Sequence, residues 1–397
     1  MSPVLTNEAE LYFEQGGPVQ RFVGRVALHL GLDLTVRVRI IGFLLITWVP
    51  LLLFALIEGR AVGASPKESL LQDFATYARF FVAVPLLIVA EMLVGPRLRA
   101  AGLQFVEGGM VRPEDHPTFD QAIARAVRWR ESVWPELIIL AVAVIGSWTF
   151  TPETVYGEGL ATWRSPMRAA GDGLRVSVTG LWYHLVALPI LQFFWFRWLW
   201  RLFIWASFLW SVSRLNLNLV ATHADQAGGL GFLGTAHTSL AIFAFCLSAV
   251  LSAEAAFLIV HEKVDIETFK VPYVAILVVV ELIFFGPLLM FVPILQRTRL
   301  AWLRDYSLFV DRYNRGFHDK WIVGQAPPDE PLLGSADIQS LADLGNSFRY
   351  IQEMRVLPFS LRTLLQLAVV TSLPCLPLLL LVMPIGQIIE LLAKAVV

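Results

Sequence analysis

The chain has little cysteine and little charge, and both shortages exclude classes of protein. Only two of its 397 residues are cysteines, Cys246 and Cys375, and both lie inside apolar runs. Neither a disulfide framework nor a paired-cysteine metal site is therefore available. Charged residues make up 16% of the sequence and hydrophobic residues 56%, whereas about a quarter of a typical soluble domain is charged. A soluble protein could not bury this much apolar surface, so we expect a membrane protein.

Catalytic and targeting motifs are also missing. The sequence contains no H-E-x-x-H, G-x-S-x-G, Walker A or paired-aspartate signature, and nothing in it identifies a cofactor. Nothing in it supports binding to nucleic acid. Acidic residues and arginines precede the first apolar run, which a secretory signal would not show. We therefore expect an uncleaved first span.

Long apolar runs are abundant. About 20 mostly apolar helical residues are needed to cross the hydrocarbon core of a bilayer. The stretches that satisfy this requirement are 40–57, 76–94, 133–150, 179–196, 235–260, 271–295 and 362–383. The sequence thus predicts about seven transmembrane helices.

The distribution of positive charge predicts the orientation of these spans. The N-terminal segment and every second connection together carry twenty-two basic residues, against seven in the alternate connections, or eight with Lys394. Basic loops tend to stay in the cytoplasm. We therefore predict an all-α, polytopic transmembrane helix bundle with its N-terminus inside and its C-terminus outside.

The predicted topology divides the chain into four parts. They are a cytoplasmic N-terminal segment, a six-span bundle, a cytoplasmic helical segment, and a seventh span with an amphipathic tail, at 1–39, 40–295, 296–361 and 362–397. Within the bundle part, an amphipathic helix is expected at 118–132, because apolar residues recur there at helical spacing.

An interfacial helix is predicted at 197–213. Arg197 and Arg201 lie among four tryptophans there, and this composition suits the headgroup zone, where indoles anchor and arginines reach towards water. The alternative is an eighth span, which would place the Arg-rich sixth connection outside.

Prolines interrupt several spans. Gly286-Pro287 and Pro374-x-x-Pro377 lie inside predicted spans, where proline removes a backbone hydrogen bond. We expect kinks or breaks at both places. They could serve packing, or they could form a hinge or an ion site.

Four ionisable residues lie at membrane depth, where a charge is costly unless it is paired or hydrated. They are Arg79, His184, Glu254 and Glu281, which share a depth band under the predicted topology. One interpretation is a buried pair between Arg79 and a glutamate that fixes helix packing. The other is a hydrated cavity whose carboxylates attract cations or protons.

The segment 221–234 is rich in glycine and joins the predicted interfacial helix to the fifth span. Gly228, Gly229 and Gly231 permit backbone conformations in which amide groups could bind an anion or a lipid headgroup. His223 and Asp225, with His237 further on, could instead bind a metal. The third interpretation is a turn in which His223 and Asp225 serve only as caps.

Two motifs carry a resemblance to a known group of proteins. The run His223-x-Asp225-x-x-Gly228-Gly229-Leu230-Gly231-Phe232-Leu233 and the later run Ala336-Asp337-Ile338-Gln339-Ser340-Leu341-Ala342-Asp343-Leu344 resemble segments of an uncharacterised group of bacterial multispan proteins. The resemblance extends from about residue 210 to the C-terminus. It implies a multi-pass protein of the bacterial inner (plasma) membrane and brings no activity with it.

Three functions are compatible with these observations. A channel or transporter for an ion or small solute is favoured by the interrupted spans and by the carboxylates at depth. A membrane scaffold or sensory subunit is the alternative, because the cytoplasmic helices could contact further copies of the chain and the Arg-rich loops suit anionic lipid headgroups. A lipid-acting membrane enzyme using His223 and Asp225 is the third.

Overall fold

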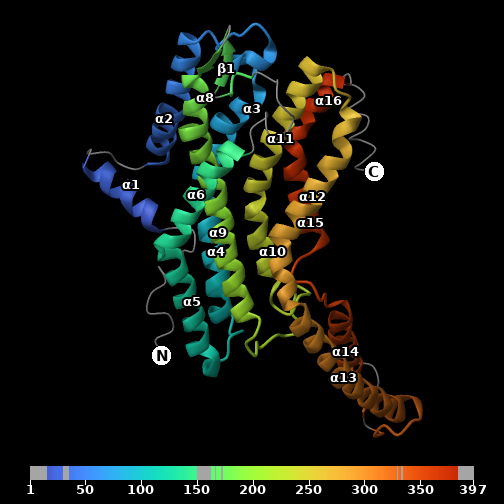
Figure 1. The fold of residues 1–397 in the computed structure, drawn as a ribbon. Coiled ribbons are helices and arrows are strands. Elements are labelled where there is room, and N and C mark those ends of the chain that lie inside the picture. The colour runs from blue at the N-terminus through green and yellow to red at the C-terminus, as the bar shows by residue number, and fades with distance from the viewer. Residues whose placement is uncertain are drawn as a thin grey trace.

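The protein is a bundle of long helices from which a helical hairpin projects at one end (Figure 1). The computed structural model describes residues 16–29, 35–149, 162–165, 167–170, 173–328, 330–331 and 334–382. The predicted amphipathic tail after Pro384 lies outside the described residues.

Six helical segments of the described chain are long and apolar enough to cross a membrane. Several of them are built from shorter elements that follow one another without a gap. The first three are α2 (Val36–Ile57); α3 (Phe74–Tyr77), η4 (Ala78–Ala83) and α4 (Val84–Glu107); and α8 (Val178–Trp182), η6 (Tyr183–Ala187) and α9 (Leu188–Val212).

The other three segments form the second half of the bundle. They are α10 (Gly231–His237), η7 (Thr238–Leu240) and α11 (Ala241–Glu262); η8 (Ile266–Phe269), α12 (Lys270–Phe285), η9 (Gly286–Phe291), α13 (Val292–Phe317) and η10 (His318–Ile322); and α15 (Leu361–Ser372), η11 (Leu373–Cys375) and α16 (Leu376–Val382).

A bent helix pair provides the seventh candidate span. α5 (His116–Glu131) is followed by α6 (Val133–Thr149), and the two helices meet at an angle of 46°. α6 coincides with the predicted span 133–150. The amphipathic helix predicted at 118–132 is α5, which buries Phe119, Ala122, Ile123 and Ala126. The described chain therefore has the six to seven long apolar helices of a multi-pass membrane protein.

The prediction of a separate interfacial helix at 197–213 is wrong. Residues 197–212 belong to α9, which follows α8 and η6 without a gap in one helical segment that begins at residue 178. Arg197 and Arg201 are 6% and 5% exposed, so they do not reach into water. They contact carboxylates inside the bundle instead, and the helix therefore has no reason to bend at them.

The prolines inside spans alter the local helix geometry as expected. η9 and η11 are 3-10 segments that contain Gly286-Pro287 and Pro374. Two further segments, η4 and η6, are π-helical, and each is followed closely by a proline, Pro85 or Pro189. Because proline lacks an N–H group, the preceding turn loses a hydrogen bond and can widen.

The remaining helical elements of the described chain lie outside the six long apolar segments. They are α1 (Pro18–His29), η2 (Pro66–Glu68), η3 (Leu70–Gln72), η5 (Pro113–Asp115) and α14 (Ala336–Glu353). A two-stranded antiparallel hairpin, β1 (Met167–Ala170) and β2 (Gly173–Val176), precedes α8, with Met167 opposite Val176. An all-α sequence prediction did not include this hairpin, which lies in a connection rather than in a span.

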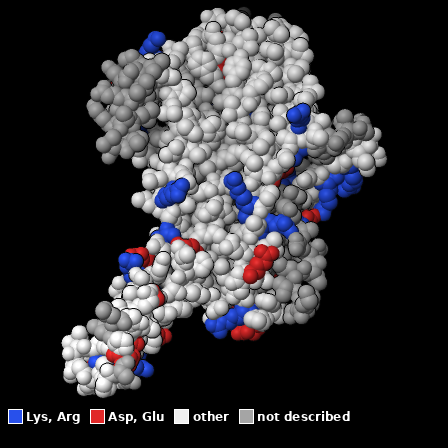
Figure 2. All heavy atoms as spheres, turned by 180° about the vertical axis from the view of Figure 1, so that it is seen from behind, with Lys and Arg blue, Asp and Glu red and all other residues white. Residues whose placement is uncertain are grey.

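The main hydrophobic core extends beyond the apolar spans. α2 has 22 residues, so its length of about 33 Å matches a hydrocarbon core of about 30 Å. Its first turn contacts α4 at Glu91, yet buried residues continue along α4 to Phe105 and along α9 to Val212. Figure 2 shows few charged side chains on the upper part of the molecule and many around its middle and lower part. The lower part thus forms a helical collar with a core continuous with that of the bundle.

The arm, defined here as residues 297–353, is the projecting hairpin of α13, η10 and α14 (Figure 1). Its helices are joined at the tip, where Lys320 Nζ lies 2.8 Å from Asp337 Oδ2 and Trp321 Nε1 donates to the same oxygen at 3.0 Å. Near the bundle, Arg299 donates to the carbonyl oxygen of Gln352 at 2.7 Å. These contacts make the arm a defined hairpin.

Candidate functional site

A cluster of five charged side chains, all but Arg39 buried, lies in the bundle, and we call it the Glu91 cluster: Arg39, Glu91, Glu136, Arg197 and Arg201. The two oxygens of Glu91 lie 2.6 Å from Arg39 and 3.0 Å from Arg201, and Arg197 is 3.6 Å away. Arg197 Nε also lies 3.3 Å from Glu136. The cluster joins α2, α4, α6 and α9.

The geometry of α9 explains part of this arrangement. Arg197 and Arg201 are four residues apart, so they project from the same helix face. The side chains of Glu91, Glu136, Arg197 and Arg201 are each 6% or 7% exposed, which leaves their charges to be balanced by one another. Such a buried network stabilises only while its members remain matched.

The start of α1 is attached to this cluster. The backbone N–H of Val19 donates to Glu136 Oε2 at 2.7 Å, and Arg197 donates to the carbonyl oxygen of Gly16 at 2.9 Å. Gly17 has φ +96°, and a Cβ there would lie 2.7 Å from Glu136 Oε1. A carboxylate at a helix N-terminus is favourable. The segment before the first span is therefore held against the bundle by Glu136.

A second charged cluster lies at the opposite end of the bundle, and we call it the Asp73 cluster: Asp73, Arg79, Arg164, Tyr183 and Glu254. Asp73 caps α3 by accepting from Thr76, and it also pairs with Arg164. Arg79 lies 3.5 Å from Glu254 and 3.1 Å from the hydroxyl oxygen of Tyr183. Arg164 is 3.7 Å from Glu254.

The charges of the Asp73 cluster are balanced within it. Burial alone would raise the pKa of the Asp73 carboxyl, but Arg164 and Arg79 lower that pKa to about 2. Glu254 is 41% exposed at its side chain and is paired with both arginines. Of the two interpretations of the ionisable band, the contacts of Arg79 are those of a structural ion pair, with Glu254 as the partner.

His184 adjoins this cluster and is buried. Its Nδ1 lies 2.5 Å from the carbonyl oxygen of Ser147, and its Nε2 lies 3.1 Å from that of Arg164. The hydroxyl of Ser147 donates to the carbonyl oxygen of His184. Both ring nitrogens therefore face backbone carbonyls, and the residue links α6, η6 and the segment that holds Arg164.

Glu281 stands apart from the other three predicted residues. It lies on α12, and within the described part of the chain no basic side chain comes within 4.0 Å of it. Its Oε2 is buried and has no hydrogen-bond partner among the described residues. The structure therefore brings Arg79, His184 and Glu254 together and leaves Glu281 separate.

The glycine-rich loop, residues 221–234, binds a carboxylate of its own chain. Asp225 Oδ1 accepts from the backbone N–H groups of Ala227 at 2.8 Å and Gly229 at 3.1 Å, and its Oδ2 accepts from Gly231 at 2.7 Å. Burial would raise the pKa of the Asp225 carboxyl, but these amides and His223 lower it. Amide groups predicted for an external anion or headgroup are thus occupied by Asp225.

The three-residue metal site predicted from His223, Asp225 and His237 is wrong. His223 Nδ1 does lie 2.8 Å from Asp225. His237, however, is buried elsewhere: its Nε2 accepts from Trp205 at 2.9 Å, and its Nδ1 lies 2.6 Å from the carbonyl oxygen of Phe284. Within the described residues, no group of three or more histidine, cysteine or acidic side chains could hold a metal ion.

The same loop holds the chain where the arm returns to the bundle. Arg355 donates from its backbone N–H to the carbonyl oxygen of Gln226 at 2.6 Å and from its guanidinium to that of Asp225 at 2.7 Å. A Cβ on Gly228, which has φ +64°, would lie 3.0 Å from the terminal carbon of Met354. The loop is therefore the docking point for the segment between α14 and α15.

The surface of the arm is the least buried part of the described fold. Large apolar side chains are exposed along it: Leu300, Leu308, Phe309, Ile322, Val323, Ile338 and Tyr350. Leu308 is 61% exposed and Ile322 69%. Apolar groups in such number on a projecting hairpin are typical of a surface that contacts another macromolecule.

Sequence reasoning missed Glu91 and Glu136, although both lie inside predicted spans. The sequence did contain a signal for a buried charge cluster: two carboxylates inside predicted spans, and two arginines, Arg197 and Arg201, four residues apart on one helix. Comparison of the chain with protein-family models, with curated proteins and with solved structures finds no match.

Proposed function

We propose that this protein is a membrane scaffold that uses its arm to assemble with a second copy of the same chain. The supporting observation is that the arm projects from the bundle, is tied to it by the glycine-rich loop, and exposes large apolar side chains. A helical bundle with spans of sufficient length supplies the membrane anchor.

Charge on the arm favours a second copy as the partner. Around Leu308, the exposed face of α13 carries Arg304, Asp305 and Arg312, so both signs alternate within a few turns. A face of mixed sign is complementary to itself when two copies meet around a two-fold axis. A partner with one dominant sign of charge would instead match a surface of the opposite sign.

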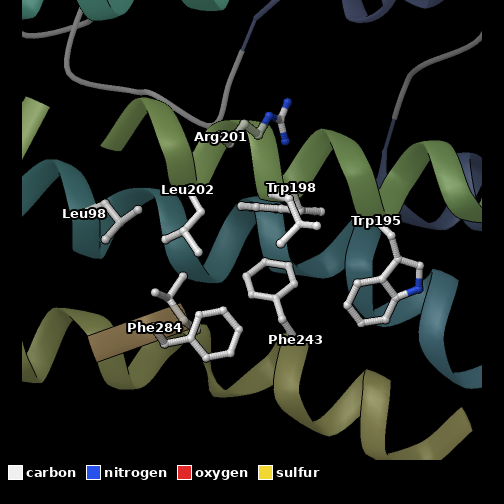
Figure 3. Close-up of a pocket in the computed structure, with 9 residues that line it drawn as sticks. Leu98, Trp195, Trp198, Arg201, Leu202, Phe243 and Phe284 are labelled. Atoms are coloured by element: carbon white, nitrogen blue, oxygen red, sulfur yellow. The ribbon is translucent and has the colours of Figure 1, made fainter. Parts of the chain in front are cut away.

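The interior of the bundle gives less support to conduction. The cavity between α4, α9, α11 and α12 has a volume of about 40 Å³, which is room for about one water molecule. Apolar side chains converge on it, including Trp198, Phe243 and Phe284, whereas Arg201 points away from it (Figure 3). A path for ions would need continuous polar lining.

Transport remains the second candidate, and one observation favours it. The Glu281 carboxylate has a buried oxygen without a partner in the described chain, and unpaired carboxylates at membrane depth are common in proton and cation pathways. A lipid-acting enzyme has less support, because the Asp225 oxygens already accept from three backbone amides. The bacterial inner-membrane location and the resemblance to the bacterial multispan group stay predictions.

Cysteine cross-linking tests the assembly. In a Cys246→Ser, Cys375→Ser background, Leu308→Cys should give a disulfide-linked dimer when native membranes are oxidised. Val62→Cys, at a position 70% exposed in the loop after α2, lies far from the arm, serves as the matched control for random collisions and should remain monomeric. A monomer at Leu308→Cys, together with a monomeric mass in mild detergent, would contradict the scaffold.

The same purified protein separates the two candidates. Liposomes containing the wild type should show no ion flux above that of empty liposomes if the protein is a scaffold. Flux that Glu281→Gln abolishes, without a change in unfolding temperature, would favour transport instead, because this substitution keeps the side-chain volume and removes the charge.

A further inference from the structure

An open groove lies where the second half of α9 meets the start of α13. Its volume is about 1030 Å³, which is at the upper end of sites for small molecules. One wall is the segment 210–219, and the other consists of η9 and the first turns of α13. Its lining includes Arg112, Trp210, Arg214, Pro293, Arg297 and Trp302.

The charge of the groove has one sign. Arg112, Arg214 and Arg297 line it, and its lining includes no aspartate or glutamate. Arg214 and Arg297 are exposed, and neither has a carboxylate within 4.0 Å in the described part of the chain. Arg112 is 3.9 Å from Glu114, an exposed residue outside the lining. Two of the three guanidinium groups are therefore available to an anion.

The other side of the groove is apolar. Leu289, Met290, Pro293 and Ile294 come from the last part of the apolar run that begins in α12, and Leu289 is 45% exposed. Arg297 is the first charged residue after Glu281. The groove therefore lies at the end of this apolar run, where charged residues begin.

Two tryptophans border this boundary. Trp210 is 48% exposed and has the guanidinium of Arg214 over its ring at 4.1 Å, while Trp302 is stacked on Tyr306. Tryptophan is enriched at the membrane interface because its ring is apolar and its N–H is polar. The cation–π contact holds Arg214 at the groove without using its remaining donors.

We propose that this groove binds an anionic phospholipid. The phosphate contacts Arg214 and Arg297, with Arg112 at the far edge, and the acyl chains lie along Leu289, Pro293 and Ile294. Guanidinium groups suit phosphate because they donate paired hydrogen bonds in a fixed plane. Neutral and zwitterionic lipids lack the net charge that the three arginines match. The groove includes the first residues of the arm, from Arg297 to Trp302, but lipid binding there does not require a second copy.

Native mass spectrometry in detergent tests the site with two defined lipids, phosphatidylglycerol and phosphatidylcholine. The wild type should retain phosphatidylglycerol in preference to phosphatidylcholine. Arg214→Gln with Arg297→Gln should lower the affinity for phosphatidylglycerol about thirtyfold, as expected for two basic residues near a lipid surface. Arg125→Gln, which changes an exposed arginine of α5 outside the lining, is the matched control and should leave lipid binding unchanged.

Three results would overturn the proposal. They are unchanged phosphatidylglycerol binding in the double variant, equal retention of the two lipids by the wild type, and displacement of the lipid by inorganic phosphate at equal concentration. The last result would assign the arginines to a free anion. The charge-preserving pair Arg214→Lys and Arg297→Lys should keep most of the binding, so a loss caused by misfolding is recognised.

Discussion

Glu91 compensates three guanidinium groups at once, which makes it the residue on which the buried charge balance most depends. Its side chain is 7% exposed, whereas that of Glu254, which also contacts two arginines, is 41% exposed. If the carboxylate of Glu254 is removed, water can solvate the arginines that it contacted, whereas water has little access to the arginines around Glu91. The same substitution should therefore have very different effects at the two sites.

We expect Glu91→Gln to lower the free energy of unfolding by about 3 kcal/mol, because it removes the carboxylate that Arg39, Arg197 and Arg201 share in a buried network. Glu254→Gln should cost about 1 kcal/mol or less. Thermal unfolding in detergent measures both. Adding Arg201→Gln to Glu91→Gln should restore part of the loss, and equal unfolding temperatures for wild type and Glu91→Gln would refute the assigned role of the cluster.

At the residue scale, the sequence predicted the depth of ionisable residues along the spans better than it predicted their ion-pair partners. It placed Arg79 and Glu254 in one band, and the structure pairs them. It assigned Arg197 and Arg201 to the headgroups, because hydropathy alone cannot show that a carboxylate on another helix faces them. Which helices face each other depends on tertiary packing, and no local pattern in the chain records it.

At the scale of elements, proline marks the places where the spans depart from regular helix. Arg79 and His184 both lie in π-helical segments, η4 and η6, that come shortly before a proline. A π-helical turn contains one more residue than an α-helical turn, so it rotates the rest of the helix about its axis. The sequence predicted breaks at Gly286-Pro287 and Pro374, but it could not indicate which prolines would widen a turn and which would tighten it.

The glycine-rich loop is the element whose function changed most between sequence and structure. Its amides bind an anion, but that anion is the Asp225 carboxylate. It also holds the chain that follows the arm, because Arg355, two residues after α14 ends, is bonded to Asp225 and Gln226. A sequence pattern shows which groups could bind an anion, but not whether the chain supplies one.

We expect Asp225→Ala to free the arm from the bundle. Three backbone amides would lose their acceptor, at a cost of about 2 kcal/mol, and hydrogen exchange should rise at 353–359. His223→Ala, which removes an exposed partner, should have a smaller effect. Because the folded pKa of Asp225 lies below its ordinary value of 3.8, its contribution is fully present above about pH 4 and is lost as the pH falls through the folded pKa. Unchanged exchange in Asp225→Ala would contradict the docking role.

At the scale of the whole molecule, the count of long apolar helices was predictable, since each predicted span corresponds to a helix. The collar was less predictable from the sequence. The helical segments that contain α4 and α9 have 34 and 35 residues, more than the about 20 that cross a bilayer. Hydropathy cannot distinguish an apolar residue that faces lipid from one that is packed inside the protein. The charged band around the middle of the molecule makes that distinction visible only after folding (Figure 2).

Orientation is the prediction on which the scaffold and the lipid site both depend. The arm and the loop after α2 lie at opposite ends of the molecule (Figure 1). The end with the arm belongs to the connections that carry twenty basic residues once Arg197 and Arg201, which lie inside α9, are left out, and the end with the loop to those that carry seven. Positive charge opposes translocation, so the arm should be cytoplasmic and the loop outside.

Single cysteines placed at the two ends measure this orientation. In the cysteine-free background, Val62→Cys and Ile322→Cys are matched probes, because the two native side chains are 70% and 69% exposed. A maleimide that cannot cross membranes should label Val62→Cys in intact cells and Ile322→Cys only after permeabilisation. The opposite pattern would invert the protein and move the arm outside. Labelling of both in intact cells would mean that an even number of spans separates them, whereas the structure offers five in that interval when the bent pair counts as one.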